Sequence, residues 1–251
     1  MRIALISDLH GNRVALEAVL VDIDHIGVDR IICLGDVATL GPEPGWVIDK
    51  LRELGCSCIM GNHDDFLLDA ELIHEYTEAP IIIEAVDWCR DQLSRDQLDF
   101  LRNFRSRLEL SLPHEDAGDD ESDGASLLLF HGSPRSHMED ILADTPAARL
   151  DEMLAGHRAT VMAGGHTHVQ MLRQHRGTLL VNPGSLGAPF LEYTGGGPPT
   201  ILPHAEYAIV EHSRGAVRVQ LQRVALDRRE LRRAAEASSN PLAPAMVQQY
   251  S

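Results

Sequence analysis

The sequence has few of the features that mark secreted or membrane proteins. It contains only four cysteines, Cys33, Cys56, Cys58 and Cys89, and none of them form a CxxC pair. Three of them lie in or beside apolar runs, where a free thiol behaves as a small buried hydrophobic group, so we expect no disulfide and no cysteine metal site. The N-terminal apolar run is interrupted at Asp8 and is too short for a signal peptide, and no apolar run is long enough to span a bilayer. We therefore predict a cytoplasmic protein with no membrane partner.

Positive charge is also scarce. The chain has 22 Lys and Arg residues against 38 Asp and Glu residues, which gives a formal net charge of −16. Non-specific nucleic-acid binding depends on neutralising phosphates with Lys and Arg, so this composition argues against it. A small phosphorylated molecule is still compatible, because a bound metal ion can dominate the local field. With 251 residues, of which 44% are hydrophobic, the chain suffices for one α/β domain.

Apolar runs and helical patterns alternate near the N-terminus. We predict strands at residues 2–7, at RIICLG and at CSCIM, separated by a helix over 14–26 and a second helix ending near Gly55. This β-α-β-α-β order predicts parallel strands with right-handed crossovers. Residues 64–104 are predicted to be mostly helical, and Ser94 with Gln97 forms a predicted capping box.

The second half of the chain is predicted to be richer in strands. RLELSL and ASLLLFH are joined by HEDAGDDESDG, which we interpret as a solvated hairpin connection rather than a cation-binding segment. A helix over 145–154 and the strand TVMAG follow. VQMLRQH, TLLVN, AEYAIVEH and AVRVQLQRV then indicate an antiparallel second sheet. We predict one domain over residues 1–238 and a poorly ordered C-terminal tail over 239–251.

Polar side chains that bind metals follow five of the apolar runs. In chain order they are Asp8 and His10, Asp36, Asn62 followed by His63, His131, and His166 with His168. Ionisable groups at the end of a buried strand need something that offsets their desolvation. The carboxyl ends of parallel strands are the usual ligand position in open α/β sheets, so these residues predict one site. The two-residue spacing of Asp8 and His10 would place both side chains on one face of a strand, and the same holds for His166 and His168.

The motifs that carry these residues occur in a recognisable order. D-x-H, G-D, G-N-H-D, H-G and G-H-T-H, together with SDLHGN, AGGHTH and NPGSLG, resemble the calcineurin-like metallophosphoesterase superfamily, and most of all its small stand-alone bacterial and archaeal branch. The resemblance extends from Ile3 to about Gly187. It implies an α/β fold, a four-layer α/β/β/α sandwich in which helices flank two mixed β-sheets, with a dinuclear metal site at the strand ends.

The resemblance also implies a role for each residue. It assigns one metal ion to Asp8, His10, Asp36 and His168, and a second to Asn62, His131 and His166, with Asp36 bridging both. His63 is implied to be the catalytic histidine near the leaving group. Two divalent ions bring a charge of about +4, and two aspartates and a bridging hydroxide remove about three, which leaves roughly +1 to attract a phosphate. Nitrogen and oxygen ligands suit divalent transition metals, namely Mn, Fe, Zn, Co or Ni.

The implied activity is hydrolysis of a small phosphodiester, with nucleotides among the candidates and a metal-bridging hydroxide as the nucleophile. An asymmetrical diadenosine-polyphosphate hydrolase or a phosphomonoesterase is the alternative, and a catalytically silent interaction module of the same fold is a further one. Gly35 and Asp36 are not followed here by the D-R-G segment of protein phosphatases, which argues against phosphoprotein substrates. Phe190 stands where close relatives carry Arg, and it either packs or stacks on a nucleobase.

Two arginines near the motifs are candidate phosphate clamps. Arg13 follows the first motif and Arg135 follows His131, and for both we weigh surface ion pairing as the alternative.

Overall fold

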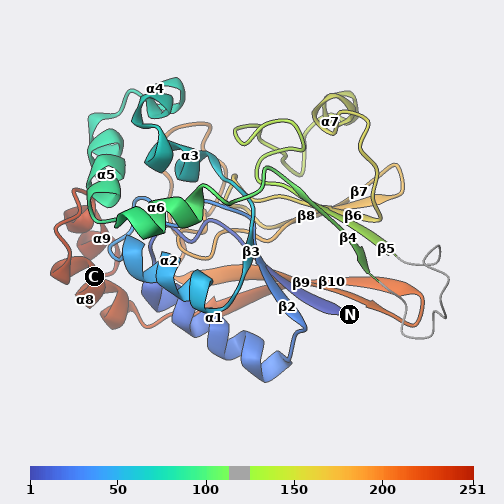
Figure 1. The fold of residues 1–251 in the computed structure, drawn as a ribbon, viewed down its shortest axis with the longest axis horizontal. Coiled ribbons are helices and arrows are strands. Elements are labelled where there is room, and N and C mark those ends of the chain that lie inside the picture. The colour runs from blue at the N-terminus through green and yellow to red at the C-terminus, as the bar shows by residue number, and fades with distance from the viewer. Residues whose placement is uncertain (113–124) are drawn as a thin grey trace.

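In the part of the chain that the structure describes, two five-stranded sheets stack face to face (Figure 1). The computed structural model describes residues 1–112 and 125–251. The first sheet has the order β10-β9-β1-β2-β3, with β1 (Arg2–Ile6), β2 (Arg30–Cys33), β3 (Ser57–Cys58), β9 (His204–Ser213) and β10 (Ala216–Ala225). The second has the order β4-β5-β6-β8-β7, with β4 (Leu108–Leu112), β5 (Ala125–Leu129), β6 (Val161–Ala163), β7 (Met171–His175) and β8 (Thr178–Asn182).

Both sheets are mixed. In the first sheet, β1, β2 and β3 are parallel, whereas β9 pairs with both β1 and β10 in the antiparallel sense. In the second sheet, β5, β6 and β8 are parallel, whereas β4 pairs with β5, and β7 with β8, in the antiparallel sense. The prediction that the last four strands form one antiparallel sheet is therefore wrong. Residues 183–203 cross from one sheet to the other, because β8 pairs with β6 whereas β9 pairs with β1.

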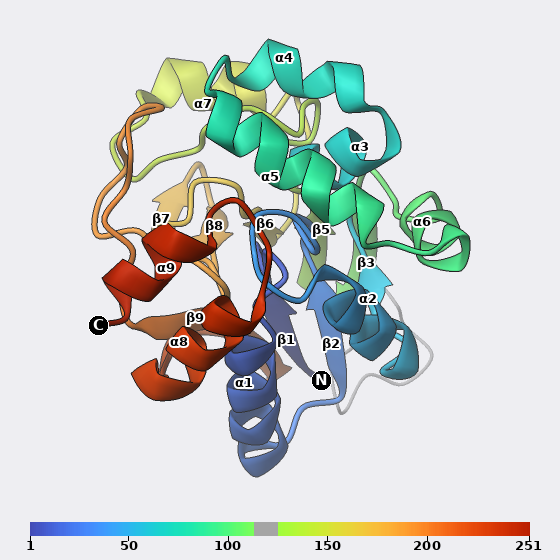
Figure 2. The same ribbon diagram turned by 90° about the vertical axis from the view of Figure 1, so that its left-hand side faces the viewer.

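Helices cover the outer face of each sheet. α1 (Arg13–Ile26) and α2 (Pro44–Glu53) pack on the first sheet, and α7 (Ala147–Met153) packs on the second (Figure 1). α8 (Arg228–Ala237) lies beside α1, and α9 (Ala243–Gln249) lies beside α8. At the end toward which β1 and β2 run, seen facing the viewer in Figure 2, lie α3 (Asn62–Leu68), η1 (Ala70–Leu72), α4 (Ile73–Tyr76), α5 (Pro80–Asp91) and α6 (Arg95–Leu101).

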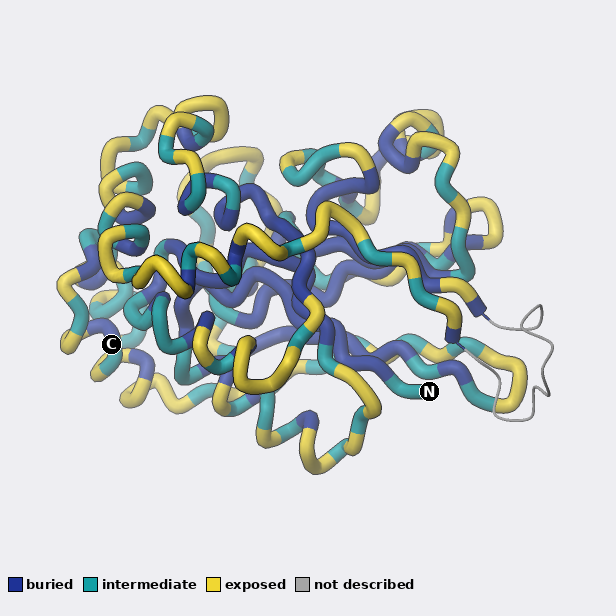
Figure 3. The backbone as a smooth tube through the Cα atoms, viewed as in Figure 1, coloured by how far each residue is buried: buried dark blue, intermediate teal, exposed yellow. Residues whose placement is uncertain are grey.

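The alternation of side chains along the strands builds this layering. On β1, Ile3 and Leu5 face the second sheet, whereas Ala4 and Ile6 face the helices. Along β5 and its extension, Leu129 faces the first sheet while its neighbour Phe130 packs with the residues of α7. Successive side chains of a strand point to opposite faces, so each sheet can be buried on both sides. The buried strands form the dark centre of Figure 3, and the predicted four-layer α/β/β/α sandwich is confirmed.

Local signals in the sequence set several helix ends. Asn12 Oδ1 accepts a hydrogen bond from the Ala15 N–H at 3.0 Å, which starts α1. The predicted capping box at α6 is confirmed, since Ser94 Oγ accepts from the Gln97 N–H at 3.3 Å and Gln97 Oε1 accepts from the Ser94 N–H at 2.9 Å. The acidic segment 114–124 lies outside the described residues. We find no helix in residues 1–112 and 125–251 with the length and apolarity of a membrane crossing.

The C-terminal segment differs from the prediction of a poorly ordered tail. Residues 243–249 form α9, and the preceding Asn240 is buried. The Asn240 amide donates to the carbonyl oxygens of Leu40 and Gly41 at 3.1 and 3.0 Å, and its Oδ1 accepts from the Leu242 N–H at 2.8 Å. These bonds attach the segment to the loop after β2, a tertiary contact that its polar composition does not reveal.

Candidate metal centre

Five parallel strands from both sheets end at one place and deliver the candidate residues there. Asp8 and His10 follow β1, and Asp36 follows β2. Asn62 is the first residue of α3, the helix that follows β3, while His131 follows β5 and both His166 and His168 follow β6. Nearly all of these residues are buried, although they are polar or charged.

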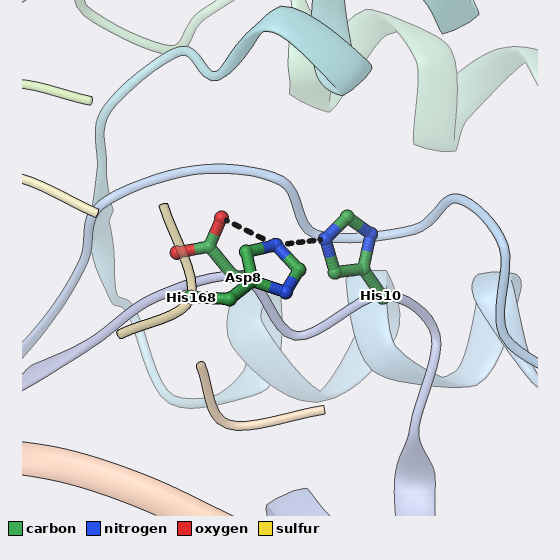
Figure 4. Close-up of side chains that lie close together, drawn as sticks. All are labelled: Asp8, His10 and His168. Carbon is green, nitrogen blue, oxygen red and sulfur yellow. Dashed lines mark hydrogen bonds and ion pairs between the residues drawn. The ribbon is translucent and has the colours of Figure 1, made fainter. Parts of the chain in front are cut away.

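The first group of donor atoms comes from Asp8, His10 and His168 (Figure 4). Their candidate ligand atoms all lie within 4.8 Å of one another. The Nε2 atoms of His10 and His168 are 3.0 Å apart, and Asp8 Oδ1 lies 3.3 Å from His168 Nε2. Two neighbouring ligands that each lie ~2.0–2.1 Å from a bound ion are separated by about 2.8–3.4 Å in octahedral or tetrahedral geometry. The spacing therefore fits coordination of one ion.

The second group comes from Asp36, His131 and His166, again with candidate ligand atoms within 4.8 Å of one another. Asn62 Oδ1 adds a neutral oxygen 3.1 Å from His131 Nε2. Asp36 Oδ2 lies 3.3 Å from His131 Nε2 and 4.0 Å from His10 Nε2. One carboxylate oxygen thus lies between the two groups.

The outer nitrogen of three histidines contacts an oxygen atom of the protein. Nδ1 of His131 lies 2.7 Å from the Leu34 carbonyl oxygen, and Nδ1 of His168 lies 2.7 Å from the Ala188 carbonyl oxygen. Nδ1 of His10 lies 3.1 Å from Thr39 Oγ1. A carbonyl oxygen accepts only from a protonated nitrogen, so it fixes the tautomer in which Nε2 presents its lone pair to the centre.

Each aspartate has one oxygen anchored and one turned inward. Asp8 Oδ2 accepts from the His166 N–H at 3.1 Å, and Asp36 Oδ1 accepts from the His63 N–H at 2.9 Å. Asp8 Oδ1 is buried and has no hydrogen-bond partner among the described residues. A buried carboxylate oxygen without a donor is costly, and a bound cation would satisfy it.

Backbone strain is concentrated at this centre. Nine non-glycine residues of the described chain have positive φ, and five of them are Asp8 (53°), His10 (46°), Asp36 (56°), His166 (70°) and His168 (57°). Such left-handed conformations cost of order 1–3 kcal/mol each and persist where the surroundings impose them. The prediction that each pair shares a strand face is wrong, since both pairs lie beyond the last strand residue and their residues have left-handed backbone conformations. Asp8 and His10 fall in one donor group, whereas His166 and His168 fall in different groups.

Charges within the centre are tightly coupled. Burial alone would lower the pKa of His131, but the carboxylate of Asp36 raises it to about 10. Burial also opposes ionisation of Asp36, yet the neighbouring histidines hold the pKa of its carboxyl well below the usual value. Burial and nearby histidines lower the pKa of both His10 and His166 to about 3. Because metal ligands bind in their deprotonated form, a cation would take the place of the proton that His131 carries.

His63 is held by aromatic packing. Its ring is 4% exposed and packs in T-shaped contact with His10, Phe66 and Tyr76, with ring-centroid distances of 5.1, 5.1 and 5.4 Å. Its Nδ1 has no hydrogen-bond partner among the described residues, so none of their carboxylates orients the ring through this nitrogen.

Asp64 has a structural role that the sequence did not reveal. Its carboxylate accepts the backbone N–H groups of Asp36, Val37 and Gly61 at 2.9, 2.9 and 3.0 Å. These bonds join the turn after β2 to the start of α3 and so position Asp36 beside Asn62. The sequence signal that could have revealed this role is the position of Asp64 as the third residue of a helix that follows a glycine. A carboxylate at that position often accepts the backbone N–H of the N-cap residue.

The two arginines pair with carboxylates. Arg13 forms ion pairs with Glu17 and Glu43 and lies over the Trp46 ring, 4.9 Å from its centroid. Arg135 pairs with Glu139. It also lines a cavity of about 390 Å³ beside Asn62, together with residues such as Phe66, His137 and Met138.

Phe190 packs against a histidine of the centre. Its ring centroid lies 4.3 Å from that of His168, with an interplanar angle of 37°. Of the two interpretations of this residue, the structure shows packing, and the ring shields one face of His168.

The same motifs and fold occur in known proteins. A family model described as the calcineurin-like phosphoesterase superfamily domain matches residues 1–206. The chain belongs to this superfamily. The uncharacterized protein MJ0912 of Methanocaldococcus jannaschii is 29% identical over 202 residues, which cover 74% of this chain and 76% of that protein.

Two solved structures of similar proteins share the whole fold of this superfamily member. A metallophosphoesterase from Sphaerobacter thermophilus is 25% identical with a TM-score of 0.74, and the match covers 100% of this chain and 98% of that one. The hypothetical protein PH1004 from Pyrococcus horikoshii is 17% identical with a TM-score of 0.79, covering 98% and 96% of the two chains. At 17% identity the second match shows the fold alone, and it agrees with the four-layer sandwich.

Proposed function

We propose that this protein is a hydrolase that uses two divalent transition-metal ions to cleave a small phosphodiester. The observation that carries the proposal is the place of Asp36, whose inward oxygen lies between two groups of metal-binding side chains. A single carboxylate shared in this way is the arrangement expected for two ions about 3.5–4 Å apart. Family membership supports phosphoester hydrolysis as the reaction class.

The proposed ligands follow from the two groups. Asp8, His10 and His168 would hold one ion, His131, His166 and Asn62 the other, and Asp36 would contact both. Of these ligands only the two aspartates are anionic, so the occupied centre would keep a positive charge for an anionic phosphate. The N/O ligand set favours Mn, Fe, Zn, Co or Ni.

Bound ions of this kind lower the pKa of water and stabilise the charge on phosphoryl oxygens. The protein would supply the rest by positioning. His63, packed against His10 with one ring nitrogen unpaired, would hold a proton toward the departing oxygen of the substrate. Asp36 Oδ1 accepts a hydrogen bond from the backbone N–H of His63, so a shift of either residue would displace the other.

The size of the neighbouring cavity supports a small substrate. About 390 Å³ falls in the range of small-molecule pockets. Asn62 lines both this cavity and the metal centre, so the part of the substrate beyond the phosphorus would extend there. Arg135 and His137 at its wall provide cationic or hydrogen-bonding groups for a second polar portion of a diester.

Metal reconstitution with a panel of model esters tests the proposal. The metal-stripped protein is loaded with Mn, Ni, Co, Zn or Mg, and release of nitrophenol from bis(p-nitrophenyl) phosphate and from p-nitrophenyl phosphate is followed. We expect faster turnover of the diester and none without metal. Turnover of the monoester alone would favour the phosphomonoesterase alternative. A protein that binds two ions and hydrolyses neither ester would contradict the proposal and favour an interaction module. As a matched pair, Asp36→Asn should abolish turnover and the exposed Asp144→Asn should not.

A further inference from the structure

One carboxylate at the centre lies outside the set that the motifs predict. Asp140 belongs to the connection between β5 and α7, and its Oδ1 lies 3.4 Å from His166 Nε2. Its other oxygen, Oδ2, accepts a hydrogen bond from the Tyr193 hydroxyl at 2.6 Å. The Asp140 side chain is 37% exposed, whereas the His166 side chain that it meets is 7% exposed. Asp140 therefore lies at the rim of the metal centre and contacts it through one histidine.

This contact completes a pattern seen at the other histidines. His10, His131 and His168 each have one ring nitrogen near an oxygen acceptor and the other directed into the centre. His166 Nε2 also lies near an oxygen, but this oxygen belongs to a carboxylate and the contact is an ion pair at 3.4 Å, longer than the 2.7 Å hydrogen bonds of His131 and His168. A carboxylate on the outer nitrogen fixes the ring orientation and increases the basicity of the nitrogen that binds metal.

The Tyr193 hydroxyl holds this carboxylate from a separate segment. Tyr193 lies on the connection between β8 and β9. The base of that connection is attached to the centre, because the Phe190 N–H donates to the His168 carbonyl oxygen at 3.0 Å. The Leu191 N–H donates to the Thr200 carbonyl oxygen at 2.9 Å and so joins the two sides of the loop to each other. The contact from Tyr193 through Asp140 to His166 thus joins this loop to a candidate ligand.

We propose that Asp140 is a positioning residue that orients His166 and so sets the affinity for the metal ion held by His131 and His166, with Tyr193 fixing the Asp140 carboxylate. The inference rests on the proposed metal centre. It goes beyond that centre because neither Asp140 nor Tyr193 belongs to a metal-binding motif of the sequence. It also predicts that the loop carrying Tyr193 and the metal influence each other.

The test is a titration of the metal-stripped protein with Mn²⁺ alone, in which electron paramagnetic resonance counts the free ion. Asp140→Ala should lower the affinity for one of the two Mn²⁺ ions by roughly 10–100-fold and leave the affinity for the other unchanged. Asp140→Asn keeps an oxygen acceptor and should lose less Mn²⁺ affinity than Asp140→Ala. Tyr193→Phe removes only the hydroxyl and should weaken the same ion by a smaller factor. Asp144→Asn, an exposed aspartate of the same connection, is the matched control and should bind as the wild type does.

A second readout needs no metal. Long-range ¹H–¹⁵N NMR of the metal-free protein, with the His166 signal assigned from its loss in His166→Gln, reports which ring nitrogen carries the proton. We expect protonated Nε2 in the wild type and a shift toward protonated Nδ1 in Asp140→Ala. Equal Mn²⁺ affinities for Asp140→Ala and Asp144→Asn would overturn the inference, as would an unchanged His166 tautomer. A wild type that binds two Mn²⁺ ions but hydrolyses no ester would instead refute the proposed function and leave this inference standing.

Discussion

Substitution of Gly61 by alanine tests whether the close approach of α3 to Asp36 builds the centre. Gly61 has φ −96° and ψ 169°, an extended conformation that alanine also adopts, so the change adds no backbone strain. A Cβ at this position would lie 2.1 Å from Asp36 Oδ1 and 2.6 Å from the Asp36 nitrogen. Carbon atoms in ordinary contact are about 3.5–4.0 Å apart, so Asp36 would have to retreat by roughly 1 Å.

The two close atoms make that retreat unavoidable. Rotating the Asp36 side chain would relieve the contact with Oδ1 but not the one with the backbone nitrogen, which is itself held by Asp64. Overpacking of this kind typically costs about 1–3 kcal/mol of stability. Because Asp36 lies between the two donor groups, a displacement of roughly 1 Å should lower kcat/KM on a diester by about 10²-fold and weaken both metal ions.

The assay compares Gly61→Ala with Gly197→Ala. In the control, the added Cβ would meet nothing closer than the Thr194 carbonyl oxygen at 3.6 Å, an ordinary contact. Thermal unfolding, Mn²⁺ stoichiometry and diester hydrolysis are measured for both variants. If Gly61→Ala kept kcat/KM and both ion affinities within twofold of the control, the steric argument for the position of Asp36 would be refuted.

Three further predictions concern His63, the metal ions and Glu206. His63→Ala should keep both ions and lower kcat by about 10²–10⁴-fold, so equal turnover at full Mn²⁺ occupancy would exclude His63 as the proton donor. Chelation with EDTA should destabilise the wild type by about 2.7 kcal/mol for each ion that is present at 100 times its Kd, and an unchanged melting temperature would argue against two bound ions. Burial raises the pKa of the Glu206 carboxyl above its usual 4.5, although His204 and Arg223 act against this. The contribution of Glu206 to stability is therefore greatest below pH 4.5 and falls as pH rises. Glu206→Gln should gain in melting temperature relative to the wild type between pH 4.5 and 7. Parallel curves of melting temperature against pH for the two proteins would contradict this.

Strand ends and their polar residues could be predicted from the sequence because both are local signals. A short apolar run that is followed by Asp36 or His131 indicates a buried strand with functional residues at its end, whichever strands lie next to it in the sheet. The parallel arrangement of the first strands followed from their alternation with helices, since a crossover connection forces it. The order of the motifs then made the family recognisable, and with it the two-sheet architecture.

Partners that are distant in the chain were decided only by the tertiary structure. Periodicity shows that β9 is a strand but not that it pairs with β1, because strand pairing depends on which buried faces can meet. The turns that bring Asp8 beside His168 have left-handed backbone conformations. Asp and His adopt such conformations more often than most residues, but this preference does not say which of the many Asp and His residues do so.

The contacts around the ligands are equally invisible in the sequence. Leu34 holds His131 through its backbone carbonyl, which every residue type has, and Asp140 meets His166 from a connection without a motif. The sequence by itself determined which side chains can bind metal. Packing of the two sheets decided how those side chains are oriented, because orientation depends on neighbours that lie far away along the chain.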